Sequence, residues 1–375
     1  SGAAAGESGK ARIIGEGAHL RYGGIHAEQA AIEDALGRGL SVRGATLFCT
    51  LEPCSFDAPE KHNPPCTDLL IRHGISRAVI ALPDPDERVR GRGFEKLRAA
   101  GIEVHVGTGA AQAMRQNEAY LLSRSQNRPF VHLKWAQSLD GCIAAAGGES
   151  KWISSDEARA QVHQLRCECD AVLVGSGTVR QDDPLLTARP QDFGAPPCGK
   201  QPLRVVLAGR KAFREKGRLV ETASESPVLL YYASDSQHQL ALERLQQAGI
   251  QTCGLPSTKN GLHLEAVLQD LSSRGIQSVL VEGGAGLIGS FISSELVDRL
   301  TVYIAPIFLG DGIRSGTQLL QPESPADAMR LCALEHEVLG QTTMISGRLA
   351  KAQAALDRLL PGASELQEGD TCLQD

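Results

Sequence analysis

The chain has 375 residues, of which 42% are hydrophobic and 22% are charged, and its formal net charge is −6. This is the composition of a globular protein with room for two domains, and it excludes wholesale disorder. An acidic chain with only 4% aromatic residues also lacks the basic, stacking surface of a general nucleic-acid binder.

No apolar run reaches the roughly 18 residues of a membrane-spanning helix. The first ten residues, SGAAAGESGK, do not have the charged and then apolar layout of a signal peptide. The cysteines are scattered from Cys49 to Cys372, unlike a secreted disulfide framework. We therefore expect a cytoplasmic protein with no membrane or nucleic-acid partner, and the sequence is compatible with a homo-oligomer.

Residues 11–108 alternate strand-like and helical patterns. We predict strands in ARIIGEG, GATLFCTLEPC, RAVIAL and IEVHVG, and helices in HAEQAAIEDALGRG, CTDLLIRHG and GFEKLRAAG. This predicts an α/β layer domain over residues 1–125, whose N-terminal strand is incomplete unless SGAAAGES supplies it. The polar segment LSRSQNRP, residues 122–129, marks the domain boundary.

A second α/β series occupies residues 129–349. Its predicted strands include FVHLKWAQSLDG, DAVLVGSG, PLRVVLAG, SPVLLYYAS and QSVLVEGG, with helices such as SDEARAQVHQLRC and HQLALERLQQAG between them. Residues 350–375 are predicted to form one helix followed by an acidic tail. The chain is therefore predicted to have two α/β domains and a C-terminal tail.

The first chemical motif combines HAE at residues 26–28 with two Pro-Cys pairs. Imidazole and thiolate are ligands that zinc accepts, and a catalytic zinc site has three protein ligands and a water. His26, Cys54 and Cys66 would supply those three, and Pro65 would place Cys66 in the first turn of a helix, where the helix dipole favours a thiolate. Glu28 would then move protons between the water and a leaving amine.

Three other interpretations remain open for these residues. The cysteines could form a disulfide, the zinc could be structural with His62 as a fourth ligand, or each motif could be ordinary packing. A nucleic-acid base editor would use the same residues, but it needs a basic groove with aromatic side chains. The catalytic site is favoured because all four residue types occur in this order.

GEGAHLRYGGIHAE, TLEPCS…PPC and DPDERVRGRGFEKLRAAGIEV resemble the deaminase half of the bifunctional deaminase-reductase family of riboflavin biosynthesis. The resemblance implies a cytidine-deaminase-like fold, a Zn²⁺ ion held by His26, Cys54 and Cys66, and Glu28 as the proton shuttle. The implied substrate is a diaminopyrimidine ribosylamino 5′-phosphate. Phe56 stands where the family usually has a histidine after Cys-Ser, and the segment APEKHN replaces the family's basic turn. These departures leave a reductase with a degenerate deaminase domain as the alternative; Lys61 could replace the missing phosphate contact.

VLVEGGAGLIGS places a Gly-x-Gly-x-x-Gly pattern after a predicted strand, which alone is a weak sign of dinucleotide binding. LKWAQSLDGCIA, GESKWISSDEARAQVHQLR, AVLVGSGTVRQDDPLLTAR and VEGG…LVDRLTVYIAPIFLG resemble the reductase half of the same family. The resemblance implies a dihydrofolate-reductase-like fold that uses NADPH to reduce the ribosyl group to ribityl.

The same resemblance assigns residues to the two ligands of the reductase. The implied cofactor-binding residues are Ala136, Trp152, Thr178, Asp182, Gly284, Ala285, Gly286, Leu287, Ile288, Gly289 and Ser290. The implied substrate-binding residues are Ser150, Arg166, Leu186, Arg189 and Glu282. We expect the guanidinium groups of Arg166 and Arg189 to donate paired hydrogen bonds to the phosphate. We expect Glu282 to accept hydrogen bonds from sugar hydroxyls. Lys134 and Asp140 flank the site without a firm role.

Overall fold

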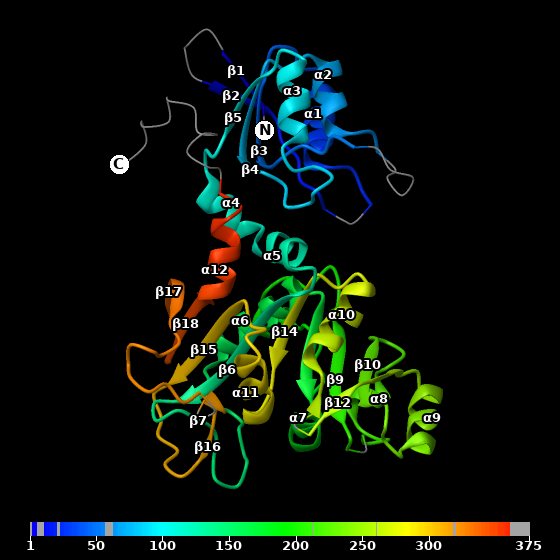
Figure 1. Cartoon of the computed structure of the whole chain (residues 1–375), viewed down its shortest axis with the longest axis vertical. Coiled ribbons are helices and arrows are strands. Elements are labelled where there is room, and N and C mark those ends of the chain that lie inside the picture. The colour runs from blue at the N-terminus through cyan, green and yellow to red at the C-terminus, as the bar shows by residue number, and fades with distance from the viewer. Residues whose placement is uncertain are drawn as a thin grey trace. The chain divides into compact units, whose positions relative to one another are not determined.

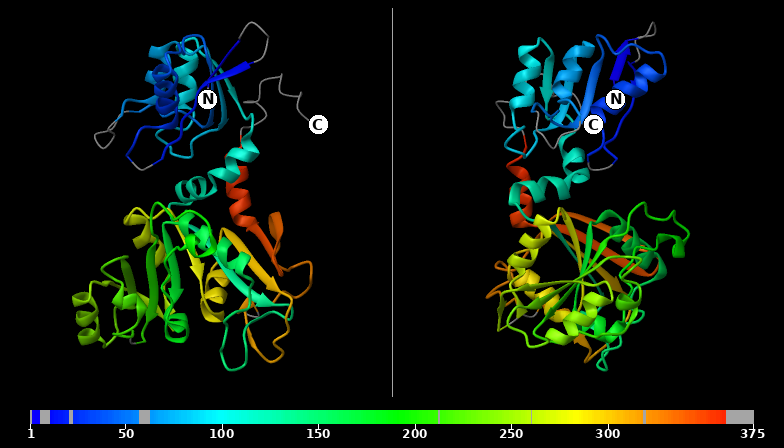
Figure 2. Two further views of the ribbon diagram at one scale, coloured as in Figure 1. Left: turned by 180° about the vertical axis from the view of Figure 1, so that it is seen from behind. Right: turned by 90° about the vertical axis from the view of Figure 1, so that its right-hand side faces the viewer.

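The computed structural model describes residues 2–5, 11–20, 23–56, 63–211, 213–259, 261–317 and 320–360. The chain divides into two compact units, one up to Ser125 and one from Gln126 to Ala354 (Figure 1, Figure 2). Residues 355–360 are grouped with the first unit. Each unit has its own sheet and its own hydrophobic core, so the predicted α/β fold class is confirmed.

The first unit is built on a five-stranded mixed sheet. In spatial order its strands are β2 (Ala11–Gly15), β1 (Gly2–Ala5), β3 (Thr46–Leu51), β4 (Arg77–Leu82) and β5 (Glu103–Val106). β1 is antiparallel to its two neighbours, whereas β3, β4 and β5 are parallel. Part of the segment SGAAAGES therefore supplies a strand between β2 and β3.

Five helices accompany this sheet: α1 (Ala27–Gly37), α2 (Cys66–His73), α3 (Arg92–Ala99), α4 (Ala110–Gln116) and α5 (Glu118–Gln126). Ala35 of α1, Leu70 of α2 and Leu97 of α3 are fully buried in one core with Ile80 of β4. α2 ends where the sequence predicts, because Gly74 adopts the left-handed conformation with φ +70°. Sheet and helices therefore share one core, which positions the start of α1 and α2.

The second unit is built on a nine-stranded sheet. In spatial order its strands are β11 (Gln251–Leu255), β10 (Val228–Ala233), β9 (Leu203–Gly209), β8 (Ala171–Gly175), β14 (Ser278–Glu282), β6 (Phe130–Ser138), β15 (Arg299–Ala305), β18 (Thr342–Leu349) and β17 (Leu331–Leu339). The strands from β11 to β15 are parallel, and β18 and β17 add an antiparallel edge. Short strands β7 (Cys142–Ala144) and β16 (Ile313–Arg314) pair with each other, as do β12 (Ser257–Thr258) and β13 (Gly261–Leu262).

The helical segments of this unit are α6 (Asp156–Glu168), α7 (Ser176–Asp182), the 3-10 helix η1 (Pro190–Phe193), α8 (Arg218–Glu221), α9 (Gln239–Gln247), α10 (Leu264–Ser273) and α11 (Ala285–Ser293). α12 (Ala350–Asp357) follows β18, and the rest of the predicted tail from residue 361 lies outside the described residues. Within the described ranges, no helix combines the length and apolar character needed to cross a membrane.

β14 lies at the centre of the large sheet, between β8 and β6. Val279, Leu280 and Val281 have no exposed surface, as expected for a parallel strand covered on both faces. The carboxyl ends of β8, β14 and β6 therefore lie side by side at one edge of the sheet. In parallel α/β sheets this edge is where ligands bind.

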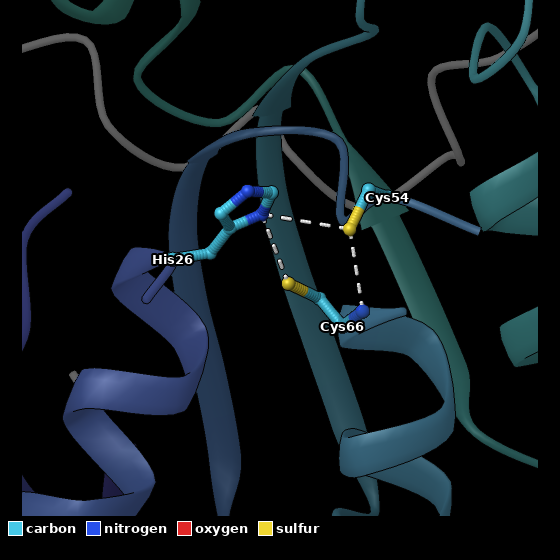
Figure 3. A group of neighbouring side chains, drawn as sticks. All are labelled: His26, Cys54 and Cys66. Carbon is cyan, nitrogen blue, oxygen red and sulfur yellow. Dashed lines mark hydrogen bonds between the residues drawn. The ribbon is translucent and has the colours of Figure 1, made fainter. Parts of the chain in front are cut away.

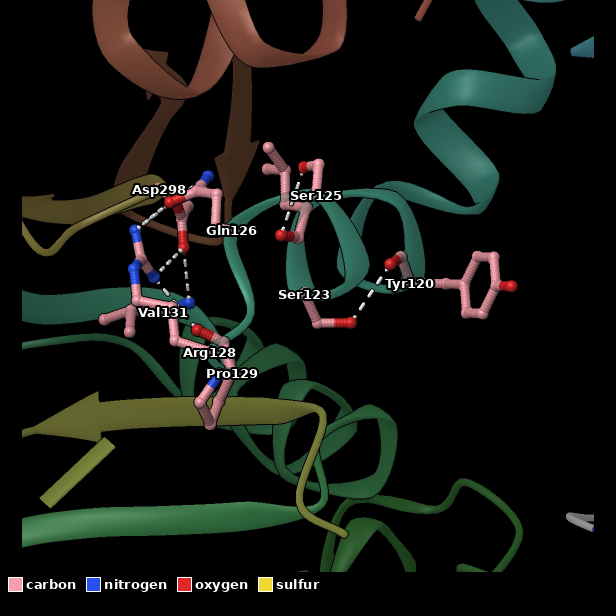
Figure 4. A network of polar contacts seen from close by, with 9 residues as sticks. Tyr120, Ser123, Ser125, Gln126, Arg128, Pro129, Val131 and Asp298 are labelled. Atoms are coloured by element: carbon pink, nitrogen blue, oxygen red, sulfur yellow. Dashed lines mark hydrogen bonds and ion pairs between the residues drawn. The ribbon is translucent and has the colours of Figure 1, made fainter. Parts of the chain in front are cut away.

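A buried carboxylate ties the start of β6 to the start of β15 (Figure 4). Asp298, which is 1% exposed, accepts hydrogen bonds from the Arg128 guanidinium at 2.7 and 2.9 Å, from Val131 N at 2.8 Å and from Gln126 Nε2 at 3.1 Å. Burial of a charge costs free energy unless it is paired, and here each oxygen has donors. The ion pair thus joins the segment before β6, the first strand of the second unit, to the start of β15.

A disulfide joins Cys167 at the end of α6 to Cys198, with the two Cα atoms 5.6 Å apart. Cys54 and Cys66 are free thiols and are not bonded to each other. The disulfide interpretation of that pair is therefore wrong. The bond that does occur was not predicted, because its cysteines belong to no recognisable spacing motif.

Candidate active sites

His26, Cys54 and Cys66 meet at one end of the first unit (Figure 3). His26 is the residue before α1, Cys54 follows β3, and Cys66 is the first residue of α2. His26 Nδ1 lies 3.5 Å from Cys54 Sγ and 3.3 Å from Cys66 Sγ, and the three donor atoms are all within 4.8 Å of one another. Three short motifs from separate elements thus converge on one point.

The start of α2 is folded around Cys54. The Cys66 N–H donates to Cys54 Sγ at 3.3 Å, and the Thr67 N–H donates to the Cys54 carbonyl at 3.2 Å. Pro65 precedes the helix and has no N–H to leave unpaired. The first N–H group of α2 therefore stabilises negative charge on the sulfur of Cys54.

This donor set fits a zinc ion. Tetrahedral bonds of about 2.0–2.1 Å to nitrogen and about 2.3 Å to sulfur place ligand atoms roughly 3.5–3.8 Å apart, close to the separations observed here. Cys54 is 8% exposed and Cys66 is 1% exposed, so the site is sheltered from bulk water. His62, the candidate fourth ligand, and Lys61, the candidate phosphate contact, lie outside the described residues.

Glu28 lies in the first turn of α1, two residues after His26, and is 8% exposed. Burial raises the pKa of its carboxyl, and negative charge on Cys54 raises that pKa further. The positive charge of His26 and a hydrogen bond with Cys66 lower the pKa. The Glu28 carboxyl is therefore buried beside the residues that carry the donor atoms.

The second site lies at the carboxyl edge of the large sheet. Glu282 ends β14 and is the register partner of Lys134 on β6. The Arg166 guanidinium, from α6, forks onto Glu282, with Nε 2.6 Å from Oε1 and Nη2 2.9 Å from Oε2. Burial opposes ionisation of Glu282, but Arg166 and Lys134 outweigh it and hold the pKa at about 2.

Lys134 is a partly buried amine on β6. Its ammonium lies 5.4 Å from the centre of the Tyr303 ring, and burial lowers its pKa while Glu282 raises it. Lys134, Glu282 and Arg166 thus form a charged cluster in the interior of the site. A group held there would meet one carboxylate and two cationic side chains.

Leu186 and Arg189 lie on the segment between α7 and η1. Leu186 is 2% exposed and has φ +58°, while the Arg189 N–H donates to His163 Nδ1 at 3.0 Å. The Arg189 side chain donates to Asp192 at 3.0 Å and to Thr187. Both arginines predicted to bind phosphate therefore have protein partners in this structure, and a substrate would have to compete with those partners.

The predicted cofactor residues lie on several elements. Thr178 and Asp182 are on α7, and residues 284–290 form the N-cap and first turns of α11. A Cβ on Gly283 would lie 3.7 Å from Thr178 Oγ1, so α7 and the start of α11 are adjacent. Ala136 is on β6 opposite Tyr303 of β15.

Two predicted residues lie on the loop between β7 and α6. Trp152 is 69% exposed, with the Arg159 guanidinium 4.4 Å from its ring, and Ser150 is partly buried. Asp140 accepts hydrogen bonds from the N–H groups of Leu309 and Gly310, so its contacts hold a loop.

Comparison with known proteins bears on the identity of these sites. The pattern of the "RibD C-terminal domain" matches residues 129–345, and that of the "cytidine and deoxycytidylate deaminase zinc-binding region" matches residues 2–82. The riboflavin biosynthesis protein RibD of Aquifex aeolicus is 38% identical over 334 residues, covering 89% of this chain and 88% of that protein. The chain belongs to the RibD family.

Other members of the family agree with this. The RibD protein of Chlamydia pneumoniae is 41% identical over 80% of this chain and 77% of its own. A crystal structure described as a diaminohydroxyphosphoribosylaminopyrimidine deaminase/5-amino-6-(5-phosphoribosylamino)uracil reductase from Thermotoga maritima superposes with a TM-score of 0.75 at 34% identity, covering 90% of this chain and 89% of that one. The chain is thus a bifunctional RibD enzyme, with a zinc-binding deaminase domain and a reductase domain.

One structural residue was missed from the sequence. Glu52, in the LEPC motif, is 3% exposed and accepts hydrogen bonds from four backbone N–H groups. Its position directly before Pro53-Cys54 was the signal that could have found it. The motif draws attention to the cysteine, whereas the contacts of the glutamate appear only once β3 and β4 are paired.

Proposed function

We propose that this chain catalyses two successive steps of riboflavin biosynthesis. In the first unit a diaminopyrimidine ribosylamino 5′-phosphate is deaminated by water, and in the second unit the ribosyl group of the product is reduced to ribityl by NADPH. The observation that carries the first step is the convergence of His26 Nδ1, Cys54 Sγ and Cys66 Sγ within 4.8 Å. RibD family membership supports both steps.

In the first unit, His26, Cys54 and Cys66 would hold the zinc ion. When bound, zinc supplies Lewis-acid activation of water at neutral pH. Glu28 would take a proton at its carboxyl and give it to the departing amine, and burial, which raises its pKa, favours the protonated form that this transfer needs. The product would carry a carbonyl oxygen where the substrate has the amine.

In the second unit, NADPH supplies the hydride. The N–H groups of Ala285 and Gly286, in the first turn of α11, would receive a phosphate of the dinucleotide, next to Thr178 on α7. Ala136, near the carboxyl end of β6, would line the same site.

The charged cluster would orient the sugar. Glu282 can accept hydrogen bonds from ribose hydroxyls, and Lys134 can hold or release a proton at Nζ because burial lowers its pKa. Arg166 and Arg189 would exchange their contacts with Glu282 and Asp192 for the 5′-phosphate, or share them with it.

The alternative is a reductase whose deaminase domain is degenerate. It is motivated by Phe56 and the altered segment between the cysteines. The intact donor set and the match to the deaminase zinc-binding region over residues 2–82 favour a working deaminase.

Zinc-loaded protein is incubated with the deaminase substrate, with and without NADPH, while ammonia and NADPH are followed. We expect ammonia release in both cases and NADPH consumption only after it. The Glu28→Gln variant should release ammonia about 10² to 10⁴-fold more slowly while retaining zinc. NADPH consumption from the deaminated compound alone, without ammonia release by the parent, would establish the alternative.

The matched control is Glu33→Gln, which removes an exposed carboxylate from the same helix. This variant should release ammonia at the parent rate.

A further inference from the structure

The buried carboxylate of Glu52 joins the end of β3, which Cys54 follows, to the loop Asp84–Gly91. Glu52 Oε1 accepts from the N–H groups of Gly93 at 2.8 Å and Phe94 at 3.3 Å, and Oε2 accepts from those of Gly91 at 3.0 Å and Asp84 at 3.3 Å. None of these donors is on the element that carries Glu52. The carboxylate thus closes the loop Asp84–Gly91 at both of its ends.

The same carboxylate caps α3. The N-cap residue of α3 is Gly91, which has no side chain to bond the first N–H groups of the helix. Glu52 provides those bonds from the end of β3, and its negative charge suits the positive end of the helix dipole. A glycine is required for this approach, because a Cβ on Gly93 would lie 2.4 Å from the Pro53 carbonyl oxygen.

The loop is ordered internally by further hydrogen bonds. Asp84 accepts from the Asp86 N–H at 2.8 Å and from the Tyr120 hydroxyl at 3.0 Å. Asp86 accepts from the Arg88 N–H at 3.0 Å and from the Arg88 guanidinium at 2.7 Å. The direction of the Arg88 side chain is therefore set by contacts that begin at Glu52.

Arg88 contacts the segment that follows Cys54. Its guanidinium carbon lies 4.6 Å from the centre of the Phe56 ring, two residues after Cys54, and its side chain is 52% exposed. The loop Asp84–Gly91 therefore contacts the chain before Cys54, at Glu52, and after it, at Phe56.

We propose that Glu52 is a positioning residue of the deaminase site, which holds the loop Asp84–Gly91 so that Arg88 and Phe56 form a wall against which the phosphorylated substrate is oriented. This inference rests on the proposed deaminase function. Glu52 touches neither the metal donors nor the reacting atoms, and it acts through the loop.

The test uses the full-length, zinc-loaded enzyme and compares Glu52→Gln with the parent. The amide cannot accept four N–H bonds, so the loop should lose its fixed position. We expect the deaminase KM to rise about tenfold and kcat to change less than about threefold, with one zinc retained per chain and parent-like reductase activity. An unchanged KM, or loss of zinc, would overturn the proposal, since a purely structural role would not separate KM from kcat.

Arg88→Ala supplies a second measurement that does not depend on a buried substitution. It should also raise the deaminase KM, and the double variant should be no worse than Glu52→Gln alone, because both changes act through one loop. Additive effects, or a parent-like KM for Arg88→Ala, would overturn the proposal. Glu95→Gln, which removes an exposed carboxylate from the first turn of α3, is the charge control and should be silent.

Two outcomes distinguish the deaminase function from the role of Glu52. Absence of ammonia release by the parent would defeat the proposed deaminase function itself. An active parent with an unaffected Glu52→Gln variant would defeat only the role of Glu52.

Discussion

Replacing Glu282 by glutamine should make the stability of the second unit less dependent on pH. The Glu282 and Arg166 side chains are each 13% exposed and are joined by two hydrogen bonds, so the variant leaves a buried guanidinium without its counter-charge. Breaking a buried pair by removing one partner is strongly destabilising. The variant also mimics the protonated form of the carboxyl.

The magnitude follows from the pKa. Burial alone would raise the pKa of Glu282, but Arg166 and Lys134 lower it from 4.5 to about 2. At about 1.4 kcal/mol for each pH unit, the ionised carboxylate contributes about 3 kcal/mol to the free energy of unfolding. Because the folded-state pKa is depressed, this contribution is present above pH 4.5 and is lost as the pH falls toward 2. The difference between parent and variant should therefore shrink from about 3 kcal/mol at pH 7 to about 1.4 kcal/mol at pH 3.

Urea unfolding followed by tryptophan fluorescence measures this difference. The chain has 2 tryptophans, Trp135 and Trp152, and both belong to the second unit, so the signal does not report on the deaminase unit. Asp192→Asn is the control, because the side chains of Arg189 and Asp192 are 32% and 51% exposed and such pairs contribute less than about 1 kcal/mol. A Glu282→Gln effect that is the same at pH 7 and pH 3 would refute the reasoning.

Three further predictions concern other sites. Removing zinc with a chelator, or Cys54→Ser, should abolish ammonia release but leave NADPH oxidation with the deaminated substrate; loss of both activities would contradict the separation of the two sites. Gly316→Ala would place a Cβ 2.1 Å from the Ala285 carbonyl oxygen at the start of α11. This variant should weaken NADPH binding about tenfold in a fluorescence titration. The control Gly194→Ala, at a glycine with a similar positive φ but open space around it, should not weaken NADPH binding. Cys198→Ser should lower the free energy of unfolding of the second unit by about 3–4 kcal/mol, because the disulfide closes a loop with a sequence separation of 31 residues. A reductant should lower the free energy of unfolding of the parent by the same amount and leave that of the variant unchanged.

The alternation of apolar runs was enough to predict most strands and helices of both sheets. The deaminase motifs also pointed to His26, Cys54 and Cys66 before any geometry was known, because zinc restricts which side chains it accepts. Their assignment as ligands, like that of the cofactor and substrate residues, stays a prediction.

Long-range polar contacts could not be predicted in the same way. Arg166 and Glu282 are 116 residues apart, and nothing local in either segment indicates that one is the partner of the other. The bonds of Glu52 depend on the register that places Leu51 beside Leu82 in two parallel strands. Trp152 was assigned by family resemblance, and the structure adds that its ring is largely exposed.

The central place of β14 has a consequence for how the second unit is made. β6 and β8 are synthesised long before β14, yet they become neighbours of the same strand only when residues 278–282 insert between them. Until then each presents an open hydrogen-bonding edge, and chain closure over so many residues slows folding. A nascent chain that stalls before β14 would therefore expose two apolar strand edges that can pair with other chains.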